Sequence, residues 1–216
     1  MDDPLDTHSF DVPSRQLNSL EKMTAQIPDV FRYEGETYSL VGIKGEGFFK
    51  VEELRLNLVM DSTSCWRGNV KHYNCINGQL VLDRLDIRTQ EEPPEINGVN
   101  AGPPVKRIVN EQKGFGFFSH SHINLGLKSK FTGLLLFGKD FIEGIYVHMG
   151  YQRPLSFETL LEIQVQDGDI ITVSNRSEEM TRLRMIWRDK GSFPDSDSGE
   201  DLKRWIDYRF SLDYGF

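Results

Sequence analysis

The sequence predicts a mainly β fold, and two tight turns carry most of that prediction. Asn77-Gly78 and Asp167-Gly168 each separate two runs of β-type residues. A tight hairpin turn needs positive φ angles, which Asn, Asp and Gly tolerate. The pattern between Phe31 and Ile87 is also strand-like. We therefore expect antiparallel strands built from hairpins, arranged as a two-sheet sandwich or a flattened barrel, with one N-terminal and two C-terminal helices.

Length and charge narrow the class of protein. A chain of 216 residues suits one large β domain or two small ones. It carries 25 Lys and Arg against 33 Asp and Glu, a formal charge of −8. This balance disfavours binding to bulk nucleic acid or to anionic membranes. The longest apolar run, Leu134–Phe137, is too short to span a bilayer. The acidic start shows no signal peptide, so we expect a soluble, cytoplasmic bacterial protein with no membrane association.

The first half of the chain is expected to begin with a flexible segment, residues 1–11, and a helix over residues 14–27. Leu17, Leu20, Met23 and Ile27 fall on one face of that helix, and Pro28 ends it. A first hairpin turns at Glu34-Gly35. Residues 54–60 start with an alternation of apolar and polar side chains, which predicts a half-buried strand.

The middle of the chain holds a loop rich in Pro and Gly. The Asn77-Gly78 hairpin is followed by residues 88–106, which contain four prolines. This loop could divide a single domain, residues 12–191, into two halves at 31–87 and 107–173.

Helical periodicity returns near the C-terminus. Met180 and Leu183 lie at helical spacing after a cap at Asn175, and Gly191 would stop this helix. Residues 192–216 are expected to form a linker and a final helix that packs on the domain. Ser198 would cap this helix, and its apolar face would consist of Leu202, Trp205, Ile206 and Phe210.

The sequence predicts no catalytic residues and no cofactor. It lacks the Gly-x-Ser-x-Gly, His-Glu-x-x-His and Walker motifs. The weak candidates for metal ligands are His120 and His122, which would face the same side of a strand, with His148 or His72 as a third ligand. This set would suit a metal-dependent hydrolase, but we favour two histidines without a metal.

Two shorter features allow competing interpretations. Cys65 and Cys75 match no zinc or redox spacing, and we expect two buried free thiols. Trp66 and Arg67 could form a contact surface, with the cation stacked on the ring or offered to an acidic partner. The interpretation that we favour places Trp66 in the core and points Arg67 to water.

Residues 110–118 form the sharpest local motif. Lys113, Phe115 and Phe117 resemble the first ribonucleoprotein signature of cold-shock domains and RNA-recognition motifs. Alternating aromatic rings can stack on bases, the glycines between them allow close approach, and the lysine can contact phosphate. The second signature is missing. Single-stranded nucleic-acid binding is therefore the alternative function, and a bent core strand explains the same residues.

A longer stretch, from about residue 28 to residue 187, is similar to a family of bacterial proteins with a Cys-Trp-Arg-Gly core motif and no assigned activity. The matching segments are 31–43, 63–68, 96–99, 132–135 and 146–151. The resemblance implies one integrated domain and transfers no functional residue.

The sequence therefore favours a binding or interaction module without catalysis of its own. Its partner would be a protein or a small molecule, and no motif indicates which of the two. Tyr, Trp and Arg are the side chains that most often anchor interfaces. On that ground the candidate contact residues are Trp66, Arg67, Tyr73, Tyr146, His148 and Tyr151.

Overall fold

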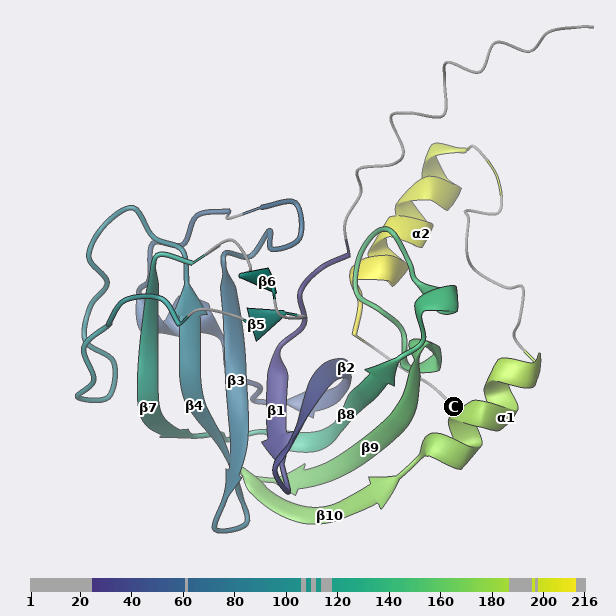
Figure 1. Ribbon diagram of the computed structural model, residues 1–216, viewed down its shortest axis with the longest axis horizontal. Coiled ribbons are helices and arrows are strands. Elements are labelled where there is room, and N and C mark those ends of the chain that lie inside the picture. Colours follow the sequence, from purple (N-terminus) through teal and green to yellow (C-terminus); the bar gives the residue numbers. More distant parts are fainter. Residues whose placement is uncertain are drawn as a thin grey trace, which may run out of the picture.

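One strongly curved β-sheet forms the body of the protein (Figure 1). The computed structural model describes residues 25–60, 62–105, 108–109, 112–113, 118–186, 196 and 198–212. Its strands are β1 (Val30–Tyr33), β2 (Glu36–Glu46), β3 (Asn69–Ile76), β4 (Gln79–Ile87), β5 (Ile108–Val109), β6 (Gln112–Lys113), β7 (His120–Lys128), β8 (Thr132–Phe141), β9 (Phe157–Gln166) and β10 (Asp169–Asn175). Eight of them form one mixed sheet in the order β10-β9-β8-β2-β1-β3-β4-β7, and β5 pairs with β6.

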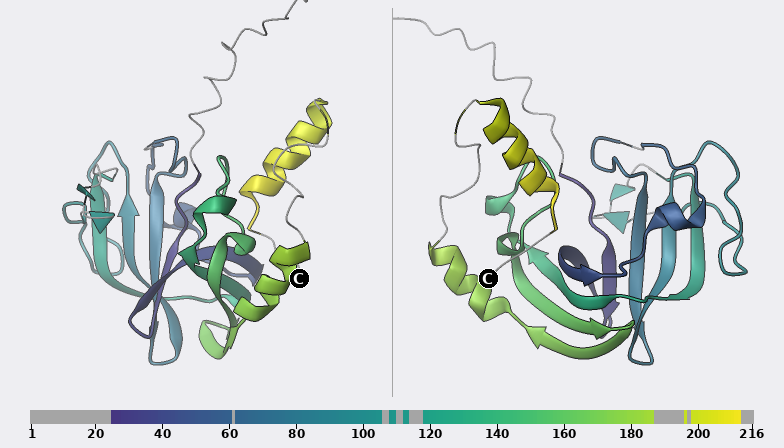
Figure 2. Two further views of the ribbon diagram at one scale, coloured as in Figure 1. Left: turned by 45° about the vertical axis from the view of Figure 1, so that its right-hand side comes forward. Right: turned by 180° about the vertical axis from the view of Figure 1, so that it is seen from behind.

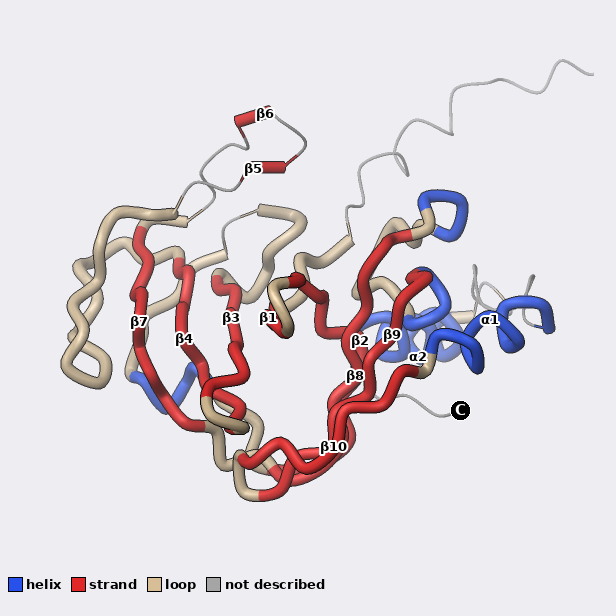
Figure 3. The backbone as a smooth tube through the Cα atoms, turned by 60° about the horizontal axis from the view of Figure 1, so that its bottom comes forward, coloured by secondary structure: helices blue, strands red, loops and turns tan. Residues whose placement is uncertain are grey.

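The sheet curls until its strand β10 meets β4 (Figure 3). Asp169 pairs with Gln79, and this contact joins the two predicted turns. The Ile170 amide donates to the Gly78 carbonyl at 2.7 Å, and the Leu80 amide donates to the Gly168 carbonyl at 2.8 Å. All four turn residues have positive φ, from 47° to 84°. The two hairpins are thus confirmed, and together they join the edge strand β10 to β4.

The expected purely antiparallel arrangement is wrong at one place. β1 runs parallel to β3, with Phe31 opposite Tyr73. The reason is the long connection from β2 to β3, residues 47–68, which contains the short helix η2 (Val51–Leu54). A crossover of this length lets a strand return parallel to β1, whereas a tight turn would have forced an antiparallel pair.

Strands from both sides of the Pro-rich loop share the sheet. β2 pairs with β8, and β4 pairs with β7. The loop itself lies along β7, where Gly102 and Ser121 exchange backbone hydrogen bonds of 2.9 and 3.0 Å. The eight-stranded sheet therefore takes strands from both expected halves.

The core fills the inside of the curved sheet. Its largest fully buried side chains include Phe31, Tyr73, Phe131 and Phe137. A second, smaller cluster lies on the outer face, where Met180 of helix α1 (Ser177–Ile186) packs on Leu136 and Leu160. Apolar residues of β8 and β9 are therefore buried on both faces of the sheet at this end.

Both C-terminal helices are present. Helix α2 (Gly199–Phe210) begins at Ser198, whose side chain accepts a hydrogen bond from the Asp201 amide at 3.1 Å, as expected for an N-cap. Residues 14–24 and 187–191 lie outside the described residues. Residues 25–27 form no helix, so the N-terminal helix prediction is wrong at its end. Neither described helix has the length and apolar composition needed to cross a bilayer.

The predicted strand over residues 54–60 is also wrong. η2 ends at Leu54, and Arg55 adopts a left-handed conformation with φ of 54°. After this break only Leu58 forms a β-bridge, with Thr89. The alternating leucines still pack on the core, which explains the pattern. Alternation here reflects burial of one side of an extended loop.

Candidate functional site

The chain segment before β1, residues 25–29, is held between two distant loops. The Gln26 amide donates to the Gly150 carbonyl at 2.7 Å, and the Gln26 side chain accepts from the Trp66 amide at 3.1 Å. The Ala25 amide donates to the Tyr146 hydroxyl at 3.0 Å. Through these bonds, residues 62–68 and 146–151 become neighbours, although about eighty positions separate them.

Arg67 lies at the centre of this junction. Its guanidinium donates to the Asp29 carboxylate at 2.7 Å, to the Ile27 carbonyl at 3.0 Å and to the Tyr151 hydroxyl at 3.2 Å. A fourth bond reaches the Asn69 carbonyl at 2.8 Å. Five fixed donors let one arginine join several chain segments in this way. Arg67 is therefore the side chain that holds the two loops and the entering segment together.

Asp29 is the partner that sequence reasoning missed. It is 2% exposed and also lies 3.2 Å from the Lys71 ammonium. Burial alone would raise the pKa of Asp29, but the charges of Arg67 and Lys71 outweigh it and hold the pKa below its usual range. A signal existed in the sequence: a single carboxylate between apolar residues at the start of a predicted strand. A buried carboxylate requires a paired cation.

Tyr73 lies beneath this junction and inside the core. Its ring packs against Phe48 with centroids 5.2 Å apart, and its hydroxyl is buried without a hydrogen-bond partner among the described residues. Burial, followed by the Asp29 charge, raises the pKa of Tyr73 well above its ordinary value. The structure thus places Tyr73 away from the surface on which the other candidates lie.

Trp66 and Arg67 have the opposite orientations from those we favoured. Trp66 is 48% exposed, whereas Arg67 is turned inward to Asp29. The expectation assumed a strand, but residues 62–68 form consecutive turns, with the Cys65 amide donating to Ser62 and the Gly68 amide to Cys65. One face of Trp66 stacks on Phe210 of α2, with centroids 4.9 Å apart.

Tyr146, His148 and Phe141 extend the exposed aromatic area. Tyr146 is 40% exposed and makes edge contacts with His148 at 5.0 Å and with Phe141 at 6.1 Å. We define the aromatic surface as Trp66, Phe141, Ile145, Tyr146 and Phe210. Its members come from the 62–68 turns, the end of β8, the η3 loop (Glu143–Ile145) and the end of α2. Figures 1 and 2 show the end of α2 beside the segment that leads into β1.

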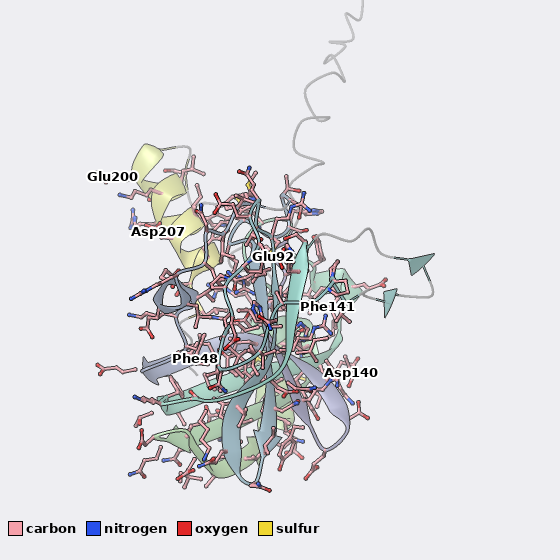
Figure 4. The ribbon with its side chains drawn as sticks, turned by 90° about the vertical axis from the view of Figure 1, so that its left-hand side faces the viewer. Phe48, Glu92, Asp140, Phe141, Glu200 and Asp207 are labelled. Atoms are coloured by element: carbon pink, nitrogen blue, oxygen red, sulfur yellow. The ribbon has the colours of Figure 1, made fainter. Side chains whose placement is uncertain are left out.

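Helix α2 borders this surface without being buried in it. Leu202 is 44% exposed, and the ion-forming side chains Glu200 and Asp207 project outward (Figure 4). The helix is attached near its C-terminal end, where the Arg153 side chain donates to the Ser211 carbonyl at 3.1 Å and the Ile43 amide donates to the Leu212 carbonyl at 2.8 Å. Its apolar stripe is therefore only partly covered.

The histidines do not converge as a metal site would require. His122 is fully buried, with Nε2 3.1 Å from the Pro94 carbonyl, while His120 contacts Ser119 and Thr89. His148 packs on Tyr146 instead. Across the described ranges, no three His, Cys, Asp or Glu side chains are placed to hold a metal ion.

His72 takes part in a buried polar cluster of a different kind. The Asp86 carboxylate, 1% exposed, lies 2.9 Å from His72 and accepts from Arg84 and Ser121 at 2.7 and 2.6 Å. Burial would raise the pKa of Asp86, but these hydrogen bonds lower it to about 2. Ser121 donates to the carboxylate and not to the imidazole, and a carboxylate with a pKa of about 2 is too weak a base to activate a hydroxyl. The cluster stabilises the sheet and has no catalytic geometry.

The cysteines and the ribonucleoprotein-like segment offer no second site. Cys65 is buried, Cys75 is half-buried, and both are free thiols. Lys113 ends the two-residue strand β6, and Phe115 and Phe117 lie outside the described residues. The resemblance of this segment to nucleic-acid binding modules stays a prediction.

Comparison of the chain with known protein families gives no match, and neither does comparison with curated proteins or with solved structures. The similarity to proteins with a Cys-Trp-Arg-Gly core motif likewise stays a prediction. Function must therefore be argued from the geometry of this chain.

Proposed function

We propose that the protein is a non-catalytic interaction module that binds a protein partner through the aromatic surface. The observation that carries the proposal is that two exposed ring pairs are held by the same chain segment. Phe210 stacks on Trp66, Tyr146 contacts Phe141, and residues 25–26 form hydrogen bonds with both Trp66 and Tyr146. Exposed aromatic side chains that adjoin one another are typical of interaction sites, whereas single exposed apolar residues are ordinary.

The support beneath the surface favours the same proposal. Arg67 and Asp29 join the two loops by partly buried hydrogen bonds, and residues 25–26 bind the Trp66 amide and the Tyr146 hydroxyl, so the rings are positioned before any partner arrives. A preorganised surface loses less conformational freedom on binding than a mobile one. Trp and Tyr also present large areas with few rotatable bonds. The acidic side chain of Asp207, three residues before Phe210 on α2, would favour a partner with basic groups there.

The test is capture of partners from an extract of the source organism by the full chain, followed by titration of the purified partner. Trp66→Ala and Tyr146→Ala should each reduce binding by a factor of about 10 to 100, as loss of an aromatic anchor does. Ile171→Ala is the matched control, because Ile171 is 51% exposed on β10. Thermal unfolding of each variant shows whether the fold persists.

The proposal requires that one captured protein is retained by the control and lost by both aromatic variants while they remain folded. Retention by all three variants, or loss only with the control, would refute it. A labelled oligonucleotide serves as the competing probe. Binding of the oligonucleotide at low salt that weakens at high salt, unaffected by Trp66→Ala, would assign the function to nucleic acid instead.

A further inference from the structure

The outer face of β8, β9 and β10 carries a depression that the aromatic surface does not include. It has a volume of about 570 Å³ and is open to solvent. Side chains two positions apart on a strand share a face, so Glu162, Gln164 and Gln166 of β9 point to the same side. On this side Gln164 stands between Leu134 of β8 and Thr172 of β10. The strand register thus places mostly polar side chains next to one another on this outer face.

Short side chains make this region hollow, because β10 supplies Thr172 and Ser174 next to the longer side chains of β9. Further along the same face, Leu160 and Leu136 are covered by Met180 of α1. The helix therefore closes one end of the outer face and leaves the polar end open.

The charges of the depression cancel at one edge. The Arg176 guanidinium donates to Glu162 at 2.6 and 3.0 Å, and it lies 3.5 Å from Glu179. Two carboxylates therefore face this single cation, and the edge offers no excess positive charge to an anionic ligand. The remaining polar walls are hydroxyls and amides, which donate and accept hydrogen bonds without charge.

We propose that this depression binds a neutral polyhydroxylated molecule of the size of a mono- or disaccharide. Thr132 accepts from the Asp167 amide at 2.9 Å and Thr172 donates to the Gln164 side-chain oxygen at 3.4 Å, which leaves the Gln164 amide nitrogen as a donor, the Thr132 hydroxyl as a donor and the Thr172 hydroxyl as an acceptor for a ligand's hydroxyl groups. The half-buried Leu134 provides an apolar contact for a sugar's C–H face. The volume falls in the range of about 300–1,000 Å³ that small-molecule sites occupy. The inference is independent of the aromatic surface.

The experiment uses the full chain labelled with ¹⁵N and four named probes: glucose, galactose, N-acetylglucosamine and sucrose. Each is titrated to about 50 mM while amide chemical shifts are followed, so that a ligand with a dissociation constant of about 1 mM would come close to saturating the site. At least one sugar should produce saturable shifts centred on the strands β8, β9 and β10. Glucuronate is the anionic counterpart and should bind more weakly than glucose.

Variants locate the binding. Thr172→Val should weaken it by a factor of about 5, and Gln164→Leu by a factor of about 10, because each removes a hydrogen-bonding group. Thr37→Val is the matched control: Thr37 is also an exposed strand threonine, and it lies in β2 outside the depression. Its affinity should stay within a factor of about 2 of the unmodified chain.

The proposal is overturned if no sugar gives saturable shifts, if the shifts centre elsewhere, or if glucuronate binds more tightly than glucose. It is also overturned if Thr37→Val weakens binding as much as Thr172→Val does. Unchanged sugar binding by Trp66→Ala would separate this site from the proposed partner surface.

Discussion

Replacement of Gly168 by alanine should destabilise the protein far more than the same replacement at Gly78. Both glycines occupy the second position of a tight hairpin turn, with φ of 84° and 77°. Alanine at such an angle costs about 1–2 kcal/mol at either position. The surroundings differ: an added Cβ at Gly78 meets nothing within 4 Å, whereas at Gly168 it would lie 2.0 Å from the Ser129 carbonyl oxygen.

The additional cost at Gly168 follows from the backbone that would have to move. The Gly168 amide donates to Phe131 at 2.9 Å, its carbonyl accepts from Leu80 at 2.8 Å, and the Ser129 amide donates to Leu80 at 2.9 Å. Relief of the clash would weaken at least two of these bonds, each worth about 1 kcal/mol. We therefore expect a total loss of about 3–4 kcal/mol for Gly168→Ala and about 1–2 kcal/mol for Gly78→Ala.

Urea unfolding at 25 °C, followed by tryptophan fluorescence, measures both free energies of unfolding. Similar m-values would show that the two variants unfold from equally compact states. Equal losses of stability, within about 0.5 kcal/mol, would refute the reasoning. They would mean that the turn of β9 and β10 is not packed against the Ser129 backbone, and that the sheet is not closed at this point.

Three other substitutions test the buried polar groups. Asp86→Asn should make the stability of the protein less sensitive to acid. The Asp86 carboxylate has a pKa of about 2 in the folded protein and 3.8 ordinarily, so its contribution to stability is complete above pH 3.8 and is lost as the pH falls toward 2. Acid unfolding curves of the two proteins should differ by about 2 kcal/mol. His122→Gln should reduce destabilisation below pH 6.5, since burial lowers the pKa of His122 and its neutral form is the one that fits; stability measured at two pH values checks this. Arg67→Lys should cost about 2–3 kcal/mol in urea unfolding and increase hydrogen exchange in residues 25–29, because lysine keeps the charge of Arg67 and loses most of its bonds.

Local chemistry made the hairpins and the C-terminal helices predictable. A turn such as Asn77-Gly78 is determined by the conformations that its own residues tolerate, and the Ser198 cap by a side chain three positions from its donor. The parallel pairing of β1 with β3 and the contact of β10 with β4 depend on segments far apart in sequence. The sequence of a strand does not indicate which other strand it pairs with, so these pairings could not be predicted.

The orientations of side chains in the candidate site could likewise not be predicted from local sequence. Arg67 was recognised as a candidate contact, but its orientation was not, because the direction of a side chain follows only from the backbone that carries it. The strand assumption made Trp66 and Arg67 alternate, whereas the turns at residues 62–68 exposed the ring and directed the half-buried cation inward to Asp29. Asp29, 38 positions away, is what makes burial of Arg67 stable.

These two outcomes have a common consequence for function. The residues that bind their own chain, Arg67 and Asp29, are charged, and the residues left at the surface, Trp66 and Tyr146, are aromatic. From composition alone, one would expect the charged residues at the surface and the aromatic residues in the core. Exposed rings supported by a largely buried ion pair would present fixed apolar area to the proposed partner while the charges are already neutralised. If the proposal holds, weakening the ion pair lowers affinity for this partner through loop order, and truncating the rings lowers it directly, so the two kinds of variant separate support from contact.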